Sequence, residues 1–260
     1  MVLKDFANHH MAAILNELKN DLMTEPWGEN NRILSTYINV NFEIAYAESK
    51  VYEDEKNNIA FWKVGNLVSI AGDPLWFVYE LNPRGPQIWN FKKTHYGNML
   101  PAPIENKDID ELQIEHKFPR FHSSWQLLLE PKAITHIMTE HNERLIDVFG
   151  KELSQNSHML FRTILGELEL QKKRSDVMHQ WYFSKYQFLM PLYLKSPNTV
   201  DLTATLEPLD DVKCYKIRTL LYPEYAYPYI RAVVKNRSAI TGWMNISDNE
   251  LDNLDFAQPE

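Results

Sequence analysis

The sequence is poor in the residues and segments on which several protein classes depend. It holds one cysteine, Cys214, so no internal disulfide is possible, and its 8 glycines argue against a glycine-rich nucleotide cradle. No run approaches about 18 consecutive apolar residues, the length that a membrane-spanning helix needs. No apolar segment with a small-residue cleavage site follows Met1, as a secretory signal would require. These absences predict a cytoplasmic protein without a membrane segment, with Cys214 as a core residue.

The motifs of common nucleotide-binding and hydrolytic sites are also missing. The P-loop, Rossmann, nucleophile-elbow and Cys-x-x-Cys patterns do not occur. His136 and His141 are five residues apart, which places them about 140° apart around a helix instead of on one zinc-binding face. A formal net charge of −8 argues against sequence-independent binding along a phosphate backbone, although it permits a local basic groove. No metal and no cofactor is predicted.

The sequence does contain enough apolar material for a core, with 44% hydrophobic and 12% aromatic residues. Apolar residues recur at three- and four-residue steps in segments that predict helices over residues 4–23, 31–46, 131–149 and 153–170. Apolar or alternating runs predict strands over residues 59–64, 67–70, 75–81, 88–91, 187–194, 200–206 and 213–222. This order lacks β-α-β alternation, so we expect an α+β fold with an antiparallel β-sheet core and N-terminal and central helices.

We expect a single α+β domain over residues 1–246, followed by an acidic C-terminal tail over residues 247–260. The tail has carboxylates but no Lys or Arg, which is typical of a solvated terminus or of a segment that docks a partner. Trp62, Trp76 and Trp89 bring large apolar area to the first strands. At least two of them should therefore pack against the N-terminal helices.

The best candidate for a site is a group of tyrosines around one arginine, made of Tyr225, Tyr227, Tyr229 and Arg231. Pro223 and Pro228 interrupt this stretch, so we expect an irregular segment instead of a helix or a central strand. Tyrosine rings, hydroxyl groups and a guanidinium together suit a phosphate, a nucleobase or a carboxylate. Gln180 and Gln187 precede the group and would add amide contacts. The alternative is aromatic packing that caps the sheet, with Arg231 paired to an acid such as Glu224.

At these residues the chain resembles an uncharacterised family, domain-of-unknown-function family 3825, which has bacterial, fungal and viral members. The Gln-Leu-x-Leu-Pro-Leu-x-Leu strand of that family is similar to residues 187–194, and its Pro-Gln-Tyr-Tyr element is matched in part by residues 179–182. Its Thr-x-Leu-x-x-x-x-Ala-Tyr-Asn-Asn-Ala-Arg segment resembles residues 219–231. The likeness extends upstream to Leu34-Ser-Thr-Tyr37 and downstream to Trp243.

A His-Ile pair followed by an arginine completes the resemblance, at His136-Ile137 and Arg144. Relatives of this kind are sometimes fused to RNA-binding modules, which implies RNA or nucleotides as ligands. The chain departs from the family at Pro228 and Tyr229, where paired asparagines are expected, and at His141, where another asparagine is expected. If those amides serve a reaction in the family, these departures imply binding without turnover.

The leading hypothesis is a protein that recognises a nucleotide or an RNA end through Arg231 and its tyrosines, with phosphodiester or nucleotide processing as a potential activity. It would act in RNA metabolism or in bacterial or phage conflict. His136 is the candidate acid–base group and Arg144 a second anion contact, provided that the fold brings them near Arg231. The competing hypothesis is a non-catalytic protein-interaction factor that uses an aromatic surface and the acidic tail.

Overall fold

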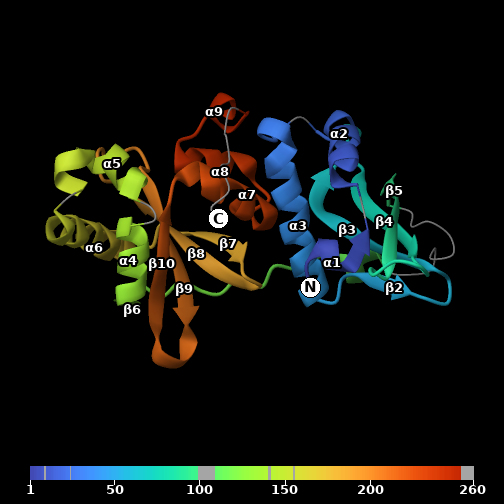
Figure 1. The fold of residues 1–260 in the computed structure, drawn as a ribbon, viewed down its shortest axis with the longest axis horizontal. Coiled ribbons are helices and arrows are strands. Elements are labelled where there is room, and N and C mark those ends of the chain that lie inside the picture. The colour runs from blue at the N-terminus through green and yellow to red at the C-terminus, as the bar shows by residue number, and fades with distance from the viewer. Residues whose placement is uncertain (9, 24, 99–108, 140–141, 155, 253–260) are drawn as a thin grey trace. The chain divides into compact units, whose positions relative to one another are not determined.

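The computed structural model describes the chain except residues 9, 24, 99–108, 140–141, 155 and 253–260 (Figure 1). The described residues have an α+β fold and divide into two compact units. Unit 1 comprises Met1–Lys117 and Asp248–Glu260, and unit 2 comprises Phe118–Ser247. The single domain over residues 1–246 stays a prediction.

Unit 1 contains a five-stranded sheet in the order β1-β5-β4-β3-β2. Its strands are β1 (Ala7–Asn8), β2 (Tyr52–Asp54), β3 (Ile59–Val68), β4 (Pro74–Leu81) and β5 (Trp89–Tyr96). The neighbours pair antiparallel except for β1, which is parallel to β5. The helical elements are α1 (Leu3–Phe6), α2 (Met11–Asp21), η1 (Glu29–Asn31), α3 (Arg32–Ala47), η2 (Ile109–Leu112) and α9 (Asp248–Asp252).

The N-terminal helices bury the aromatic residues of this sheet, as the sequence predicts. Trp62, Trp76 and Trp89 are all 0% exposed. The Trp62 ring lies 5.3 Å from Phe42 of α3, and the Trp89 ring lies 6.3 Å from Phe6 of α1. Two of the three tryptophans therefore pack on helices, which confirms the expectation.

Strand β3 is one bulged strand, so the prediction of two strands separated by a turn at Gly65-Asn66 was wrong. Its pairing with β4 shifts register between Lys63 and Val68, and Gly65 has a φ of 53°. A Cβ at Gly65 would lie 2.3 Å from Oδ1 of Asn41 and 2.6 Å from Oη of Tyr37. The glycine thus permits both the left-handed backbone and the close approach of α3.

Unit 2 contains a second five-stranded sheet in the order β6-β10-β9-β8-β7. Its strands are β6 (Gln126–Leu128), β7 (Met178–Tyr182), β8 (Lys185–Leu192), β9 (Leu202–Leu209) and β10 (Cys214–Leu221). They pair antiparallel except for β6, which is parallel to β10. The helical elements are α4 (Pro131–Thr139), α5 (Asn142–Ser154), α6 (Ser157–Arg174), η3 (Asp210–Val212), α7 (Pro223–Val233) and α8 (Arg237–Met244).

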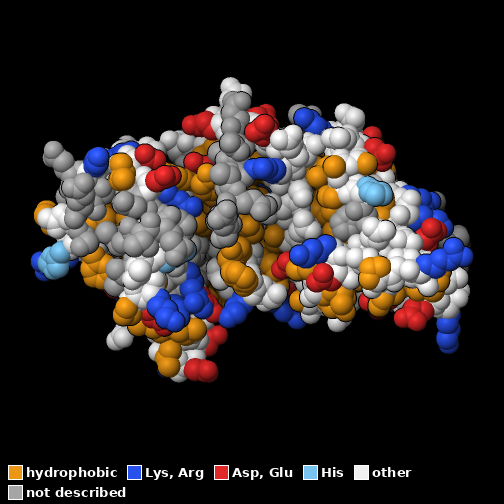
Figure 2. Space-filling view, in the orientation of Figure 1, with side chains coloured by type: hydrophobic (Ala, Val, Ile, Leu, Met, Phe, Trp, Pro, Cys, Tyr) orange, Lys and Arg blue, Asp and Glu red, His pale blue; other side chains and the backbone are white. Residues whose placement is uncertain are grey.

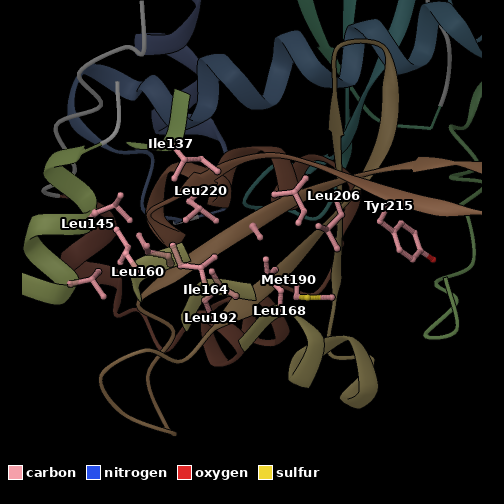
Figure 3. Packing of buried hydrophobic residues seen from close by; sticks show 14 of the residues in the cluster. Ile137, Leu145, Leu160, Ile164, Leu168, Met190, Leu192, Leu206, Tyr215 and Leu220 are labelled. Atoms are coloured by element: carbon pink, nitrogen blue, oxygen red, sulfur yellow. The ribbon is translucent and has the colours of Figure 1, made fainter. Parts of the chain in front are cut away.

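The two faces of the unit 2 sheet differ in chemistry. On one face an apolar core joins the strands to α4, α5 and α6, with Leu145, Leu160 and Ile164 among its buried members (Figure 3). Helix α7 packs on β7 and β9, and in Figure 1 it lies on the other side of the strands from α4, α5 and α6. The residues that alternate toward this second face include buried polar side chains, namely Gln180, Gln187, Thr203, Thr205 and Glu207.

Several element boundaries differ from the sequence predictions. Residues 4–23 form α1, β1 and α2 in place of one helix, and residues 131–149 form α4 and part of α5. The acidic tail begins with α9, in which Leu251 is 0% exposed, so this part of the tail is packed and not solvated. Cys214 is buried in β10, as expected.

Replacing Gly65 with Ala should lower the free energy of unfolding by about 2–5 kcal/mol, because the new Cβ meets Asn41 and the backbone is left-handed. The matched control is Gly166→Ala in α6, where a Cβ meets nothing within 4 Å. That change should raise stability by up to about 1 kcal/mol. Urea unfolding measures both, and a Gly65→Ala protein as stable as the parent would contradict the assigned packing.

Candidate functional site

The segment that carries the tyrosine–arginine group is a helix, so the expectation of an irregular segment was wrong. Pro223 occupies the first turn of α7, where its missing N–H removes no intrahelical bond. Pro228 lies inside the helix and removes one such bond. Ala226, Tyr227 and Ile230 are each 0% exposed. Burial of this kind stabilises a helix that local propensity disfavours.

The helical period divides the group into two pairs. Tyr225 and Tyr229 are one turn apart on a half-buried face. Tyr227 and Arg231 are one turn apart on a face about 160° away. These two are 0% and 5% exposed. The four residues therefore do not surround one ligand position, and Arg231 lies within the protein interior.

Arg144 of α5 lies against the start of α7. Its Nη1 donates a hydrogen bond of 2.6 Å to the carbonyl oxygen of Leu220 in β10. Its guanidinium carbon is 5.7 Å from the ring centres of both Tyr222 and Tyr225, within the range of cation–π attraction. The hydroxyl of Tyr222 donates to Asp147 of α5. We call Arg144, Asp147, Tyr222 and Tyr225 the Arg144 cluster; it unites two predicted site residues, Arg144 and Tyr225.

The Arg144 cluster is partly desolvated. Burial lowers the pKa of Arg144, and Tyr225, Tyr222 and Glu224 oppose that shift. An arginine keeps its charge at neutral pH despite such a shift. Burial, followed by the hydrogen bond to Asp147, raises the pKa of Tyr222, so its hydroxyl stays protonated.

His136, the candidate acid–base group, is half-buried on α4. The next residue, Ile137, packs beside Leu220 in the core (Figure 3). Leu220 is also the residue whose carbonyl binds Arg144. His136 and Arg144 thus come from helices that meet the same end of β10. His141, considered with His136 in the sequence, lies outside the described residues.

Gln180 and Gln187 lie in the interior of unit 2. They are cross-strand partners in β7 and β8, and Nε2 of Gln180 donates a hydrogen bond of 3.2 Å to Oε1 of Gln187. The two residues are 2% and 4% exposed. A buried amide pair satisfies part of its own hydrogen-bonding capacity and stabilises the sheet. The structure therefore places both glutamines in the packing of the sheet instead of at an open site.

A buried carboxylate on the second face of the unit 2 sheet was not identified as a site residue from the sequence. Glu207 of β9 is 3% exposed and accepts hydrogen bonds of 2.5 Å from Nζ of Lys185 and from Nε of Arg218. Burial raises the pKa of Glu207, but the two charged donors lower it more, so the net shift is downward. The apolar–polar alternation of residues 202–207 is the sequence signal that places Glu207 on this face.

Tyr229 meets the turn between β7 and β8 instead of Arg144. Its ring lies 5.3 Å from that of Tyr182, edge to face, and the ring of Tyr182 lies 4.5 Å from that of Phe183. Tyr182 is 37% exposed and Phe183 is 76% exposed. This exposed aromatic turn was not predicted from the sequence.

The sequence pattern of one known family matches residues 18–239, which include every residue of the candidate site; its description is Domain of unknown function (DUF3825). The chain belongs to this family. No curated protein and no solved structure matches the chain. The DUF3825 match confirms the suspected resemblance, and it spans parts of both units.

Three other features of this DUF3825 protein bear on a site. No three or more His, Cys, Asp or Glu side chains are grouped to hold a metal ion in the described part of the chain. None of the described helices is long and apolar enough to cross a membrane. A hollow of about 250 Å³ lies between α6 and the segment after β8, lined by Glu167, Arg174, Tyr193 and Lys195 among others. None of the predicted site residues lines it.

Because Arg231 is buried, Arg231→Lys should lower the melting temperature by several degrees. A compact ammonium does not reproduce the planar guanidinium in a closed environment. Arg162→Lys on the exposed face of α6 is the matched control and should leave the melting temperature unchanged. An unchanged melting temperature for Arg231→Lys would return Arg231 to the role of an accessible ligand anchor.

The lowered pKa of Glu207 makes a specific prediction for stability against pH. A carboxyl with a depressed folded-state pKa stabilises the fold above its unfolded pKa of about 4.3 and loses this contribution as pH falls through the folded pKa. Glu207→Gln should cost about 1–3 kcal/mol at pH 7 and should lose less stability than the parent between pH 6 and pH 3.

The control for Glu207 is Glu169→Gln, because Glu169 is an exposed member of an ion pair with Lys172 in α6. It should change stability by under about 0.5 kcal/mol at pH 7. Urea unfolding at a series of pH values measures all three proteins. Parallel pH profiles for the parent and Glu207→Gln would show that Glu207 does not contribute to the acid sensitivity.

Proposed function

We propose that the chain binds a nucleotide or an RNA end at the Arg144 cluster, in the cytoplasm. The arginine would contact the phosphate, and Tyr222 and Tyr225 would lie beside the sugar and base. The guanidinium and the aromatic rings are the groups that RNA-binding proteins use for phosphates and unstacked bases. Compared with the sequence hypothesis, the proposal moves the anion contact from Arg231 to Arg144.

The observation that carries this proposal is the fixed position of the Arg144 guanidinium. A carbonyl hydrogen bond holds one of its nitrogen atoms, and two tyrosine rings flank it. A side chain held in this way loses less conformational entropy on binding than a free surface arginine. Its partial burial also strengthens its attraction to an anion, since screening by water is reduced.

The N-terminus of α7 adds to this attraction. The helix has 11 residues and begins at Pro223, directly after its N-cap residue Tyr222, whose side chain makes no capping hydrogen bond. Backbone N–H groups at a helix N-terminus favour negative charge. Figure 2 shows acidic and basic side chains interspersed over the visible face, and the net charge is −8. These features favour binding at a local site over contact along a whole phosphate backbone.

His136 is the proposed acid–base group if the bound phosphate ester is processed, because imidazole is the side chain that most often transfers protons in catalysis. Its neighbour Ile137 shares a core cluster with Leu220, whose carbonyl oxygen binds Arg144. Pro228 and Tyr229 stand where the resemblance places paired asparagines. Since these positions lie on α7 beyond Tyr225, their replacement favours a site that binds without efficient turnover.

Arg144→Lys should weaken binding of a 5′-phosphorylated RNA dinucleotide about tenfold, because lysine keeps the charge and loses the planar stacking on two rings. Fluorescence anisotropy of a 3′-labelled dinucleotide at fixed salt measures the affinity. The melting temperature of each protein shows whether the fold is intact.

Arg162→Lys supplies the matched control, since it makes the same chemical change on the exposed face of α6. It should bind the dinucleotide like the parent. Equal affinities of Arg144→Lys and the parent would contradict the proposed phosphate contact. If the parent cleaves the dinucleotide, His136→Ala should cleave it more slowly. Equal cleavage rates of the two proteins would contradict the role of His136.

A further inference from the structure

The turn between β7 and β8 places a phenylalanine where the backbone disfavours it. Phe183 has a φ of 49° and Ser184 a φ of 58°, so both residues of this two-residue turn are left-handed. Asn and Gly are the usual residues in such turns, because a bulky side chain with positive φ is strained. Phe183 gains no burial in return, being 76% exposed. A strained and exposed aromatic residue points to a role in binding.

Phe183 ends a line of aromatic rings that begins at the Arg144 cluster. The rings of Tyr222 and Tyr225 are 5.9 Å apart. Tyr229 follows Tyr225 by one helical turn on the same face of α7, a rise of about 6 Å. The ring of Tyr229 contacts that of Tyr182, which contacts that of Phe183. We call these five rings the aromatic track.

Two cations lie beside the exposed end of the track. Lys185 is the cross-strand partner of Tyr182, and its side chain is 57% exposed. The side chain of Arg218 is 46% exposed. Both bind Glu207, which is buried, so the three side chains together carry a net charge of +1 at neutral pH. This end of the track therefore favours an anionic ligand over a basic protein surface.

We infer that the aromatic track binds a single-stranded RNA segment of several nucleotides, with its terminal phosphate at Arg144 and its more distant bases against Tyr182 and Phe183. This inference rests on the proposed function and extends it from a nucleotide to a strand. Successive aromatic side chains beside basic groups are the means by which proteins hold single strands without reading their sequence. The spacing of one helical turn between rings suits an extended strand.

The test compares a 5′-phosphorylated uridine octamer with the corresponding dinucleotide, both labelled at the 3′ end. Phe183→Asn is the informative variant, because asparagine suits the left-handed turn and removes the ring. Its melting temperature should equal or exceed that of the parent. Its affinity for the octamer should fall about tenfold, and its affinity for the dinucleotide should stay the same within about twofold.

Two further variants control the experiment. Phe183→Trp keeps a stacking face and should retain octamer binding. Val212→Ala removes another exposed apolar side chain in unit 2, 67% exposed in the turn between β9 and β10, and should bind the octamer like the parent.

The outcomes separate this inference from the proposed function. If Phe183→Asn binds the octamer as tightly as the parent while Arg144→Lys does not, RNA binding by the aromatic track is contradicted and phosphate binding at Arg144 is supported. If the parent binds neither oligonucleotide, both are wrong. If sedimentation shows that Phe183→Asn dissociates a dimer of the parent without changing octamer affinity, the turn is an interface between copies and the inference is overturned.

Discussion

The arrangement of the candidate site depends on the burial of Tyr227 and Arg231 on one face of α7. An α-helix advances 100° per residue, so fixing these two residues in the interior places Tyr225 and Tyr229 on the opposite side. Those tyrosines then meet Arg144 at one end of the helix and Tyr182 near the other. Arg231, the most conspicuous charged residue of the segment, therefore has a structural role in the interior and does not face the proposed site.

Helix α7 packs on β7 and β9, and the second face of the unit 2 sheet carries buried polar side chains. The Gln180–Gln187 hydrogen bond and the ion-paired Glu207 require defined partners, and each is costly to leave unsatisfied in the interior. Because these contacts join neighbouring strands, the polar layer favours one strand register, at some cost in stability relative to an apolar layer.

The sequence predicts the elements whose pattern is long and regular, and it fails where tertiary contacts decide. The buried stripe of α3 and the strands β8–β10 follow from apolar periodicity. The parallel strands β1 and β6 have two and three residues, too few for any period to show. The sequence predicts an irregular segment where α7 lies, because two prolines disfavour a helix locally. The burial of one face of α7 stabilises the helix despite them.

The candidate site was predicted in composition and not in arrangement. The sequence identifies Arg144 and Tyr225, but residues so far apart in the chain meet only through the packing of α5 against the start of α7. Gln180 and Gln187 look like ligands in the sequence because nothing there shows that they face each other. Phe183 could not be identified from the sequence, because its significance lies in a positive φ and in exposure.

Photochemical crosslinking tests the central claim that nucleic acid binds along the outer face of α7. A 5′-phosphorylated octamer containing 4-thiouridine at each position in turn would be crosslinked to the parent protein, and the modified peptides mapped by mass spectrometry. We expect crosslinks to Tyr222 and Tyr225 from the 5′ end and to Tyr182 and Phe183 from interior positions. Crosslinks confined to unit 1, or the same set from every position of the strand, would contradict it.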